Sequence, residues 1–409
     1  MTRKMMMGAV LLSMALSAHA QEKVLTLQQC IDMAMKQNYS MQASEKSIER
    51  AKAMQGTAWD VDKTEISFGQ DLTTGVSTDN AIIVSQGMEF PTYYIAMHKQ
   101  LKAETQAEKS KHLVLQSALT SEVMSTYYQL VYEKQRVRLL AQQDSVLTLY
   151  KQLADKRYQA GETHRLEVAS VEKMLRENGL ERQMALSEAE GVRMQLAKLL
   201  NDASIEPADQ QIQPIDMKQA DFNYLQTPEG QYANDRLEIA NKAVTVAKNG
   251  YAPSLSVSLK NQLVLSGWNP YHVDRSKFSE GNFLGFEFGV GVPLFFGATK
   301  AKVKAAKKDR EIAELEMREE KQQREKEYLA ALSKCNSTFV RMNYYQQEGD
   351  KKAEELSRLG GLEYQTGGIS YHEYIEALQE SIDIKMKHIE AINDYNQAVI
   401  VLKKLTNTL

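Results

Sequence analysis

The chain has 409 residues, of which 43% are hydrophobic, 8% are aromatic and 25% are charged. Its formal net charge of −3 at pH 7 argues against a nucleic-acid partner, because nucleic-acid-binding domains carry a basic excess. The two cysteines, Cys30 and Cys335, lie in helical stretches and indicate no disulfide framework.

The first 20 residues have the pattern of a secretory signal peptide. Two basic residues precede an apolar stretch over 5–16, and Ala18-His19-Ala20 forms an A-x-A cleavage site. An uncleaved membrane anchor is the alternative, but the apolar stretch is short for a span. Cleavage after Ala20 would remove Arg3 and Lys4 and take the net charge from −3 to −5. The new first residue, Gln21, is not a cysteine, so we expect no lipid attachment there.

The mature chain contains no run of about 18 consecutive apolar residues, so we expect no transmembrane helix. Two destinations are open to such an exported chain. One is a soluble compartment, and the other is an outer membrane crossed by β-strands, whose pattern is weak in each segment.

An internal repeat organises the chain. Tyr158-Gln159-Ala160-Gly161 recurs 206 residues later as Tyr364-Gln365-Thr366-Gly367, and Glu167 matches Glu373 in the same register. In both copies a long polar helix precedes the motif and a second helix follows it, so Gly161 and Gly367 are predicted turn residues. We expect a first repeat over 21–206, a linker over 207–228 marked by prolines and aspartates, and a second repeat over 229–409.

Helices are expected over 25–58, 93–158, 164–201, 230–250, 297–365 and 370–407. Within 93–158, two sets of residues have the seven-residue spacing of coiled coils: Val123, Leu130 and Val137, and then Leu140, Leu147 and Ala154. At about 1.5 Å per residue this helix would extend roughly 100 Å, which is long for a compact globule. The segment 300–327 is mostly charged and indicates a solvated helix, with a narrow apolar seam at Ala301, Ala305, Ile312 and Leu315.

Two segments alternate strictly between apolar and small or polar residues. In 254–265 the apolar residues are Leu255, Val257, Leu259, Leu263 and Leu265, and in 284–294 they are Leu284, Phe286, Phe288, Val290, Val292 and Leu294. About 11 residues is the length that a tilted membrane strand needs. We therefore expect Val257, Phe286, Phe288 and Val290 to face lipid and the residues between them to face water.

The first repeat has a weaker version of this pattern. Ile66, Phe68 and Leu72 alternate, and a partner strand is expected over 81–90. The connections over 73–79 and 267–282 are predicted to face the cell exterior. A soluble sandwich could also use alternating strands, but four strands alone cannot close a barrel or bury their edges, so the chain requires partner chains.

With this order of elements, the chain resembles the TolC-type outer-membrane efflux proteins over essentially its whole mature length. The supporting motifs are Arg157-Tyr158-Gln159-Ala160-Gly161, Glu363-Tyr364-Gln365-Thr366-Gly367, the closing helix over 391–405, Asn38, Asn234, Tyr251-Ala252-Pro253 and Gly291-Val292-Pro293-Leu294. The resemblance implies a mainly α fold with membrane β-strands. Internally duplicated long helical hairpins would form a periplasmic tunnel, and four strands from each chain of a homotrimer would form one twelve-stranded barrel. It also implies a periplasmic adaptor (membrane fusion) protein and an inner-membrane pump as partners, in efflux or type I secretion.

The same resemblance implies site residues at the periplasmic entrance of the tunnel. Glu373 and Glu376 fall where the family places an acidic, cation-selective ring, and Glu167 is equivalent to them in the first repeat. Tyr364 falls where the family uses a tyrosine to hold the entrance shut, whereas Ile369 stands where some members carry a linking arginine. As the alternative, these glutamates are ordinary first-turn acids favoured by the helix dipole.

No catalytic constellation or phosphate-binding loop is apparent, so we expect no enzyme, no cofactor and no metal. His372 and Glu376 are spaced i, i+4 and could bind a metal, or they form a polar pair on a helix surface. The sequence therefore predicts a passive outer-membrane conduit that extends into the periplasm. The alternatives are a periplasmic coiled-coil adaptor or scaffold, and a secreted metal-binding enzyme.

Overall fold

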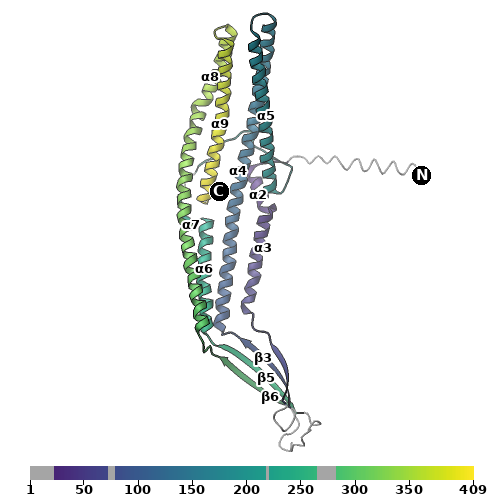
Figure 1. Ribbon diagram of the computed structural model, residues 1–409, viewed down its shortest axis with the longest axis vertical. Helices are drawn as coiled ribbons and strands as arrows, with labels where there is room; N and C mark the ends of the chain where they lie inside the picture. The colour runs from purple at the N-terminus through teal and green to yellow at the C-terminus, as the bar shows by residue number, and fades with distance from the viewer. Residues whose placement is uncertain (1–22, 72–78, 218–220, 265–281) are drawn as a thin grey trace, which may run out of the picture. The chain divides into compact units, whose positions relative to one another are not determined.

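A computed structural model describes residues 23–71, 79–217, 221–264 and 282–409 (Figure 1). The predicted signal peptide over 1–20 and most of the two connections predicted to face the exterior lie outside the described residues. The chain divides into two compact units. The first, which we call the hairpin unit, comprises the chain up to residue 43 with 113–227 and 322–409; the second, the sheet unit, comprises 44–112 and 228–321.

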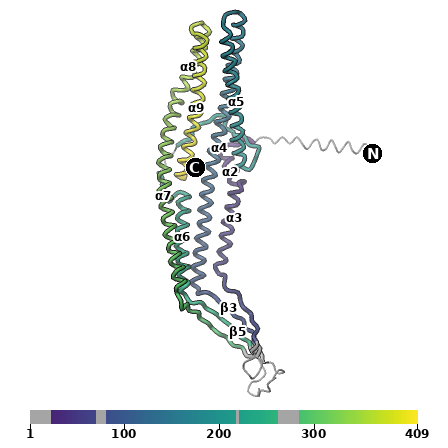
Figure 2. Tube along the Cα trace, in the orientation of Figure 1, coloured from purple at the N-terminus to yellow at the C-terminus, as the bar shows by residue number. Residues whose placement is uncertain are grey.

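Each unit draws segments from both sequence repeats, so the repeat boundaries at 206 and 229 stay a prediction. The hairpin unit contains α2 (Leu27–Gln37), most of α4 (Pro91–Gln159), α5 (Arg165–Leu200), the end of α7 (Gly297–Tyr344), a π-helical segment (Tyr345–Gly349), α8 (Asp350–Thr366) and α9 (Tyr371–Leu405). The sheet unit contains most of α3 (Tyr39–Met54), the start of α4, α6 (Pro228–Lys248), the start of α7, and the strands β2 (Glu65–Asp71), β3 (Asp79–Met88), β5 (Ser254–Val264) and β6 (Asn282–Gly291). Figure 2 traces this order of helix, two strands, long helix and helix, which occurs twice as the sequence predicted.

The predicted helix over 25–58 is broken in the structure. Asn38 adopts an extended backbone conformation (φ −67°, ψ 125°) between α2 and α3. Its side chain accepts a hydrogen bond from the Ser40 backbone N–H and donates one to the Leu199 carbonyl oxygen. The bond with Ser40, two residues away, offers the backbone a local alternative to a continuous helix.

The predicted helix over 297–365 is also interrupted, by the π-helical segment Tyr345–Gly349. A Cβ atom added to Gly349 would lie 2.8 Å from Cδ1 of Tyr345. The absence of a side chain at Gly349 therefore permits the Tyr345 ring to pack against the backbone here, within one wide turn of the helix.

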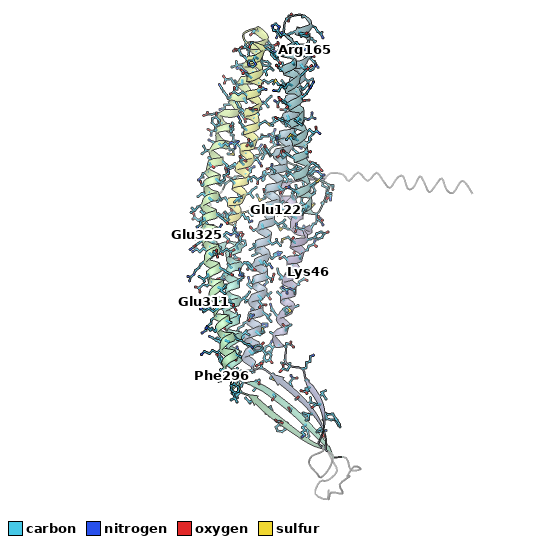
Figure 3. The ribbon with its side chains drawn as sticks, in the orientation of Figure 1. Lys46, Glu122, Arg165, Phe296, Glu311 and Glu325 are labelled. Atoms are coloured by element: carbon cyan, nitrogen blue, oxygen red, sulfur yellow. The ribbon has the colours of Figure 1, made fainter. Side chains whose placement is uncertain are left out.

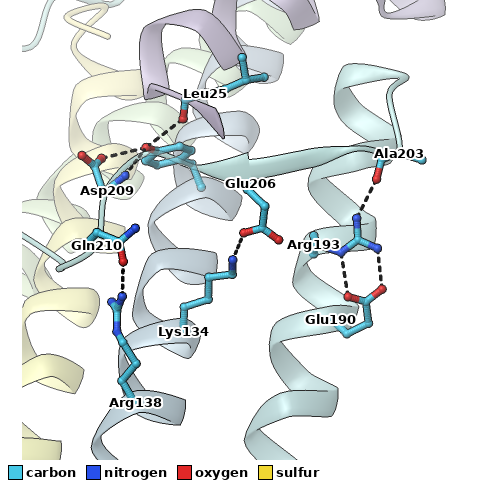
Figure 4. A network of polar contacts seen from close by, with 10 residues as sticks. Leu25, Lys134, Arg138, Glu190, Arg193, Ala203, Glu206, Asp209 and Gln210 are labelled. Atoms are coloured by element: carbon cyan, nitrogen blue, oxygen red, sulfur yellow. Dashed lines mark hydrogen bonds and ion pairs between the residues drawn. The ribbon is translucent and has the colours of Figure 1, made fainter. Parts of the chain in front are cut away.

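A two-stranded parallel sheet that the sequence did not predict joins β1 (Lys23–Leu25) to β4 (Ile205–Pro207). Figure 4 shows the polar contacts around it. Lys134 pairs with Glu206, the Tyr127 hydroxyl donates to Asp209 Oδ2 at 2.9 Å, and Arg138 Nη1 donates to Gln210 Oε1 at 2.5 Å. The start of the predicted linker is thereby held against α4.

The four longer strands form an antiparallel sheet in the order β2-β3-β5-β6. Directly opposed residues share a face of a sheet. One row runs Ile66, Val84, Leu259, Phe286, and the row beside it on the opposite face runs Glu65, Ser85, Ser258, Glu287. The alternation predicted from β5 and β6 therefore extends across all four strands and gives one largely apolar face.

Five of the six predicted coiled-coil positions of α4 form part of the core, and the sixth, Val137, is only half-buried. Val123, Leu130, Leu140, Leu147 and Ala154 are all at most 1% exposed. The apolar seam predicted in 300–327 is not buried in the single chain. Ile312 and Leu315 are more than half exposed, and the buried residue of this stretch is Val303, which was not predicted. No helix among the described residues is long and apolar enough to span a membrane.

Candidate functional site

Two tight turns close the helical hairpins of the hairpin unit. Gly161 follows α4 and Gly367 follows α8, each with φ +77°. The N–H groups of Glu162 and Gly368 donate to the carbonyls of Arg157 and Glu363, five residues earlier, at 2.9 Å and 2.8 Å. This C-terminal cap, which occurs in both copies, requires a left-handed backbone conformation at the turn residue, and glycine adopts that conformation most easily. Both predicted turn glycines therefore occupy turns of the same geometry.

The two repeated glutamates occupy different environments after these turns. Glu373 Oε2 accepts the Ser370 backbone N–H at 2.7 Å, while the Ser370 hydroxyl accepts the Glu373 N–H at 3.3 Å, which completes a capping box. Hydrogen bonds from Ser370, first its side chain and then its backbone, lower the pKa of Glu373. Glu167, in contrast, is largely buried and accepts a bond from the Thr163 hydroxyl.

Glu376 pairs with His372 on the surface of α9. The His372 Nε2 to Glu376 Oε1 distance is 3.4 Å, and the side chains are 82% and 64% exposed. Among the described residues, no group of three or more histidine, cysteine, aspartate or glutamate side chains could hold a metal ion. The arrangement is that of a solvated i, i+4 pair.

Arg157 joins the two hairpins, a role that the sequence did not reveal. Its Nη1 donates to the Tyr364 hydroxyl at 2.7 Å and lies 3.7 Å from Glu167 Oε1. These three side chains come from α4, α8 and α5. We call this set the arginine link. A guanidinium group can hold both partners at once because it presents several donors in a fixed plane.

Aromatic rings surround the arginine link. Tyr364 stacks on Tyr374 with centroids 5.0 Å apart and planes at 8°, and Tyr150 packs against Tyr374 at 4.8 Å. Tyr371 lies 6.5 Å from Tyr150, and burial, with a smaller effect from the charge of Glu167, raises the pKa of Tyr371. The cluster therefore attaches α4 to the α8–α9 hairpin through apolar as well as polar contacts.

Gly360 allows the α8–α9 hairpin to close tightly beneath these rings. A Cβ added there would lie 3.3 Å from both Tyr374 Cδ2 and Ala377 Cβ.

Figure 3 shows Arg165 at the start of α5, beside the turn that contains Gly161. Its guanidinium lies 5.9 Å from the ring of Tyr158, the repeat equivalent of Tyr364, so the two repeated tyrosines contact different arginines.

No family model matches this sequence, and no curated protein matches it either. Several solved structures are similar. The CmeC outer membrane channel of Campylobacter jejuni has a TM-score of 0.73 at 18% identity, over 93% of this chain and 85% of that one. VceC of Vibrio cholerae gives 0.74 at 15% identity over 93% and 95% of the two chains. The MtrE channel of Neisseria gonorrhoeae, in its open state, gives 0.74 at 17% identity over 93% and 88%.

These similarities extend over nearly the whole length of both chains. They confirm the predicted fold, that of the TolC-type outer-membrane channels.

Proposed function

We propose that this chain is a subunit of a passive outer-membrane channel that extends into the periplasm. Three copies would each contribute four strands to one barrel, and their helices would enclose a water-filled tunnel. The chain would act without catalysis, in efflux or type I secretion, with an inner-membrane pump supplying energy and a periplasmic adaptor protein connecting the two. The proteins of similar fold are channels rather than enzymes, which supports this reading.

The apolar face of the four-stranded sheet carries this proposal. Ile66, Phe68, Phe286 and Phe288 on this face are 69–77% exposed in the single chain. Exposure of so large an apolar surface to water is unfavourable on a soluble protein, whereas lipid would cover it. The sheet also ends in two unpaired edges, β2 and β6, which copies of the chain could pair with each other.

The alternative of a periplasmic coiled-coil adaptor accounts for the long helices only. It gives no reason for a sheet with aromatic residues at exposed positions of one face and glycines at 285, 289 and 291 of the other.

The trimer is directly testable. Chemical cross-linking of purified outer membranes is expected to give a band at three times the monomer mass, and the unheated band should shift on boiling in SDS, because closed barrels resist SDS at room temperature. A protein that stays monomeric in mild detergent would contradict the channel.

At the entrance, we propose that three copies of Glu373 and Glu376 form a cation-attracting ring, with Glu167 within the arginine link and Tyr364 holding the entrance shut. Both ring glutamates are exposed, and the Ser370 hydrogen bonds favour the ionised form of Glu373. Because its pKa is lowered on folding, the stability from this cap is present above the unfolded pKa and is lost as the pH falls through the folded pKa.

We expect Glu373→Gln with Glu376→Gln to reduce cation selectivity and the block by hexamminecobalt(III), because a multivalent cation is attracted in proportion to its charge. Glutamine can replace glutamate in a capping box, and Thr26 with Gln29 forms such a box in this same chain, so the helix start should be preserved.

Reversal potentials and block in planar bilayers measure both effects. Glu380→Gln with Asp383→Asn, a double change of two exposed acids further along α9, is the matched control. Wild-type selectivity in the first double variant would mean that these glutamates are only first-turn acids.

A further inference from the structure

A groove in the sheet unit is lined by an excess of lysines. It has a volume of about 670 Å³ and lies along α3, α4 and α6. Its charged lining residues are Lys52, Lys99, Lys102, Lys109, Lys242 and Glu238. We call it the lysine groove. With five cations and one anion, its local charge opposes the negative net charge of the chain.

Most of this charge is not neutralised within the chain. Lys242 pairs with Glu238 at 2.6 Å. Among the described residues, no carboxylate lies within ion-pair distance of the other four lysines, and all four are exposed. Elsewhere on these helices lysines have acidic partners, as Lys46 has in Glu49 at 2.8 Å. Unpaired cations gathered in a groove indicate an anionic ligand.

Between residues 99 and 109 of α4, the lysines and the glutamates lie on different faces of the helix. At about 3.6 residues per turn, Lys99, Lys102 and Lys109 lie on one face, and Glu104 and Glu108 lie on the opposite one. Glu108 is directed toward Arg50 and Lys111, at 3.9 Å and 3.8 Å, and not toward the groove. The acids of this stretch therefore do not neutralise the lysines of the groove.

The groove lies close to the point where helices give way to strands. Helix α4 begins at Pro91, three residues after β3 ends, which places Lys99 about 12 Å along the helix at roughly 1.5 Å per residue. Lys52 precedes the end of α3 by two residues, and Lys242 precedes the end of α6 by six. Lysines from three helices thus converge at the strand-proximal end of the groove.

Exposed aromatic residues mark this same junction. Trp59 is 58% exposed, Phe295 is 91% exposed, and Phe296, at the start of α7 in Figure 3, is 49% exposed. Belts of aromatic residues lie at the membrane–water interface of β-barrel proteins, at the level of the lipid headgroups. The lysines lie just beyond this level on the helical side.

The groove face of α4 itself changes from apolar to cationic away from the sheet. Ile95, one helical turn before Lys99 on the same face, is 45% exposed. An exposed apolar residue followed by lysines is the order that lipid tails and headgroups require. The four-carbon stem of lysine can also lie along apolar surface while its ammonium group reaches a phosphate.

The start of α7 adds to this cationic zone. Lys300, Lys302, Lys304 and Lys307 occur within its first eleven residues and are exposed, and the first acid of the helix is Asp309. Clusters of four to eight basic residues beside a membrane segment attract anionic lipid headgroups.

From these observations we propose that the lysine groove binds the phosphodiester headgroup of an anionic phospholipid, in the leaflet that faces the helices. The inference rests on the proposed function, because it requires the sheet to lie in a membrane. A lipid fits better than a soluble anion, because the groove lies near the helix–strand junction, where exposed aromatic residues, an exposed isoleucine and a lipid-compatible sheet occur.

The test uses the full-length protein, purified in mixed micelles that contain either phosphatidylglycerol or phosphatidylcholine. Native mass spectrometry counts the lipids retained on the protein. We expect wild-type protein to retain phosphatidylglycerol preferentially. Lys52→Gln, Lys99→Gln and Lys102→Gln combined should reduce this retention about tenfold or more, since each lysine contributes to attraction of an anionic headgroup. Glutamine keeps the helix propensity and most of the stem.

The matched control is Lys334→Gln, Lys351→Gln and Lys387→Gln, which removes three exposed lysines from the hairpin unit and should retain lipid as wild type does. Equal retention of the two lipids by wild-type protein, or undiminished retention by the groove variant, would overturn the proposal. Equally tight binding of soluble glycerol phosphate would also overturn it, in favour of a soluble anion. Migration of the same samples on SDS gels, with and without boiling, separates the two proposals. If the wild-type band does not shift on boiling, the channel proposal is wrong. If the band shifts but the protein retains no lipid, only the groove proposal is wrong.

Discussion

Phe288→Arg is expected to abolish the SDS-resistant trimer that unheated samples should show. Phe288 lies on the apolar face of β6 opposite Val257 of β5, is 73% exposed in the single chain, and contacts Phe286 edge-to-face at 6.0 Å. An arginine on the lipid face near the middle of a membrane costs about 2–4 kcal/mol, and a trimer would contain three. Semi-native SDS gels, with and without boiling, measure the loss of the trimer band.

Gly285→Ser is the matched control on the same strand. Residue 285 lies on the other face, opposite Lys260, and the nearest atom to an added Cβ is the Lys260 carbonyl oxygen at 4.0 Å. Gly289 shares that face but is less suitable, because a Cβ there would collide with the Ser256 hydroxyl oxygen until that side chain rotated. Assembly of Phe288→Arg together with failure of Gly285→Ser would mean that the two faces are reversed, since a shift by one residue exchanges them.

The long elements were predictable because their periodicity is strong and extends over many residues. The alternation in β5 and β6, which Asn261 interrupts, predicted which residues share a face, and the seven-residue spacing in α4 predicted buried positions. The interruptions were not predictable in this way. The break at Asn38 depends on its bond to the Leu199 carbonyl, 161 residues away, and no local pattern contains that contact.

The arginine link was missed for a related reason. Arg157 and Tyr364 are 207 residues apart, and only the packing of the two hairpins brings them together. The repeat did contain a signal, because the residue equivalent to Arg157 in the second copy is Glu363. A position where two otherwise similar copies differ in charge is one where their roles can differ. Glu167 and Glu373 carry no such signal, because both are glutamates, although one joins the link and the other caps a helix.

Loss of the arginine link is expected to open the proposed entrance. Arg157→Ala removes the bond to Tyr364 and leaves the largely buried Glu167 without its cation. A charged hydrogen bond of this kind, discounted for the partial exposure of Arg157, contributes about 1 kcal/mol. Three chains together would contribute about 3 kcal/mol, which corresponds to roughly a hundredfold change in the ratio of closed to open channels.

Single-channel recording in planar bilayers measures this ratio, and Arg157→Ala should show long openings at higher conductance. Tyr364→Phe removes the hydroxyl but keeps the stacking on Tyr374, so it should give a smaller change. The double variant should resemble Arg157→Ala alone, because the two residues share one interaction and their effects are then not additive.

Arg182→Ala is the matched control. Arg182 lies 3.9 Å from Asp144 within the α4–α5 hairpin and does not join the two hairpins, so its loss should leave the conductance unchanged. If Arg157→Ala and Arg182→Ala both conduct as wild type does, the entrance is held shut by contacts between chains and not by the link within each chain.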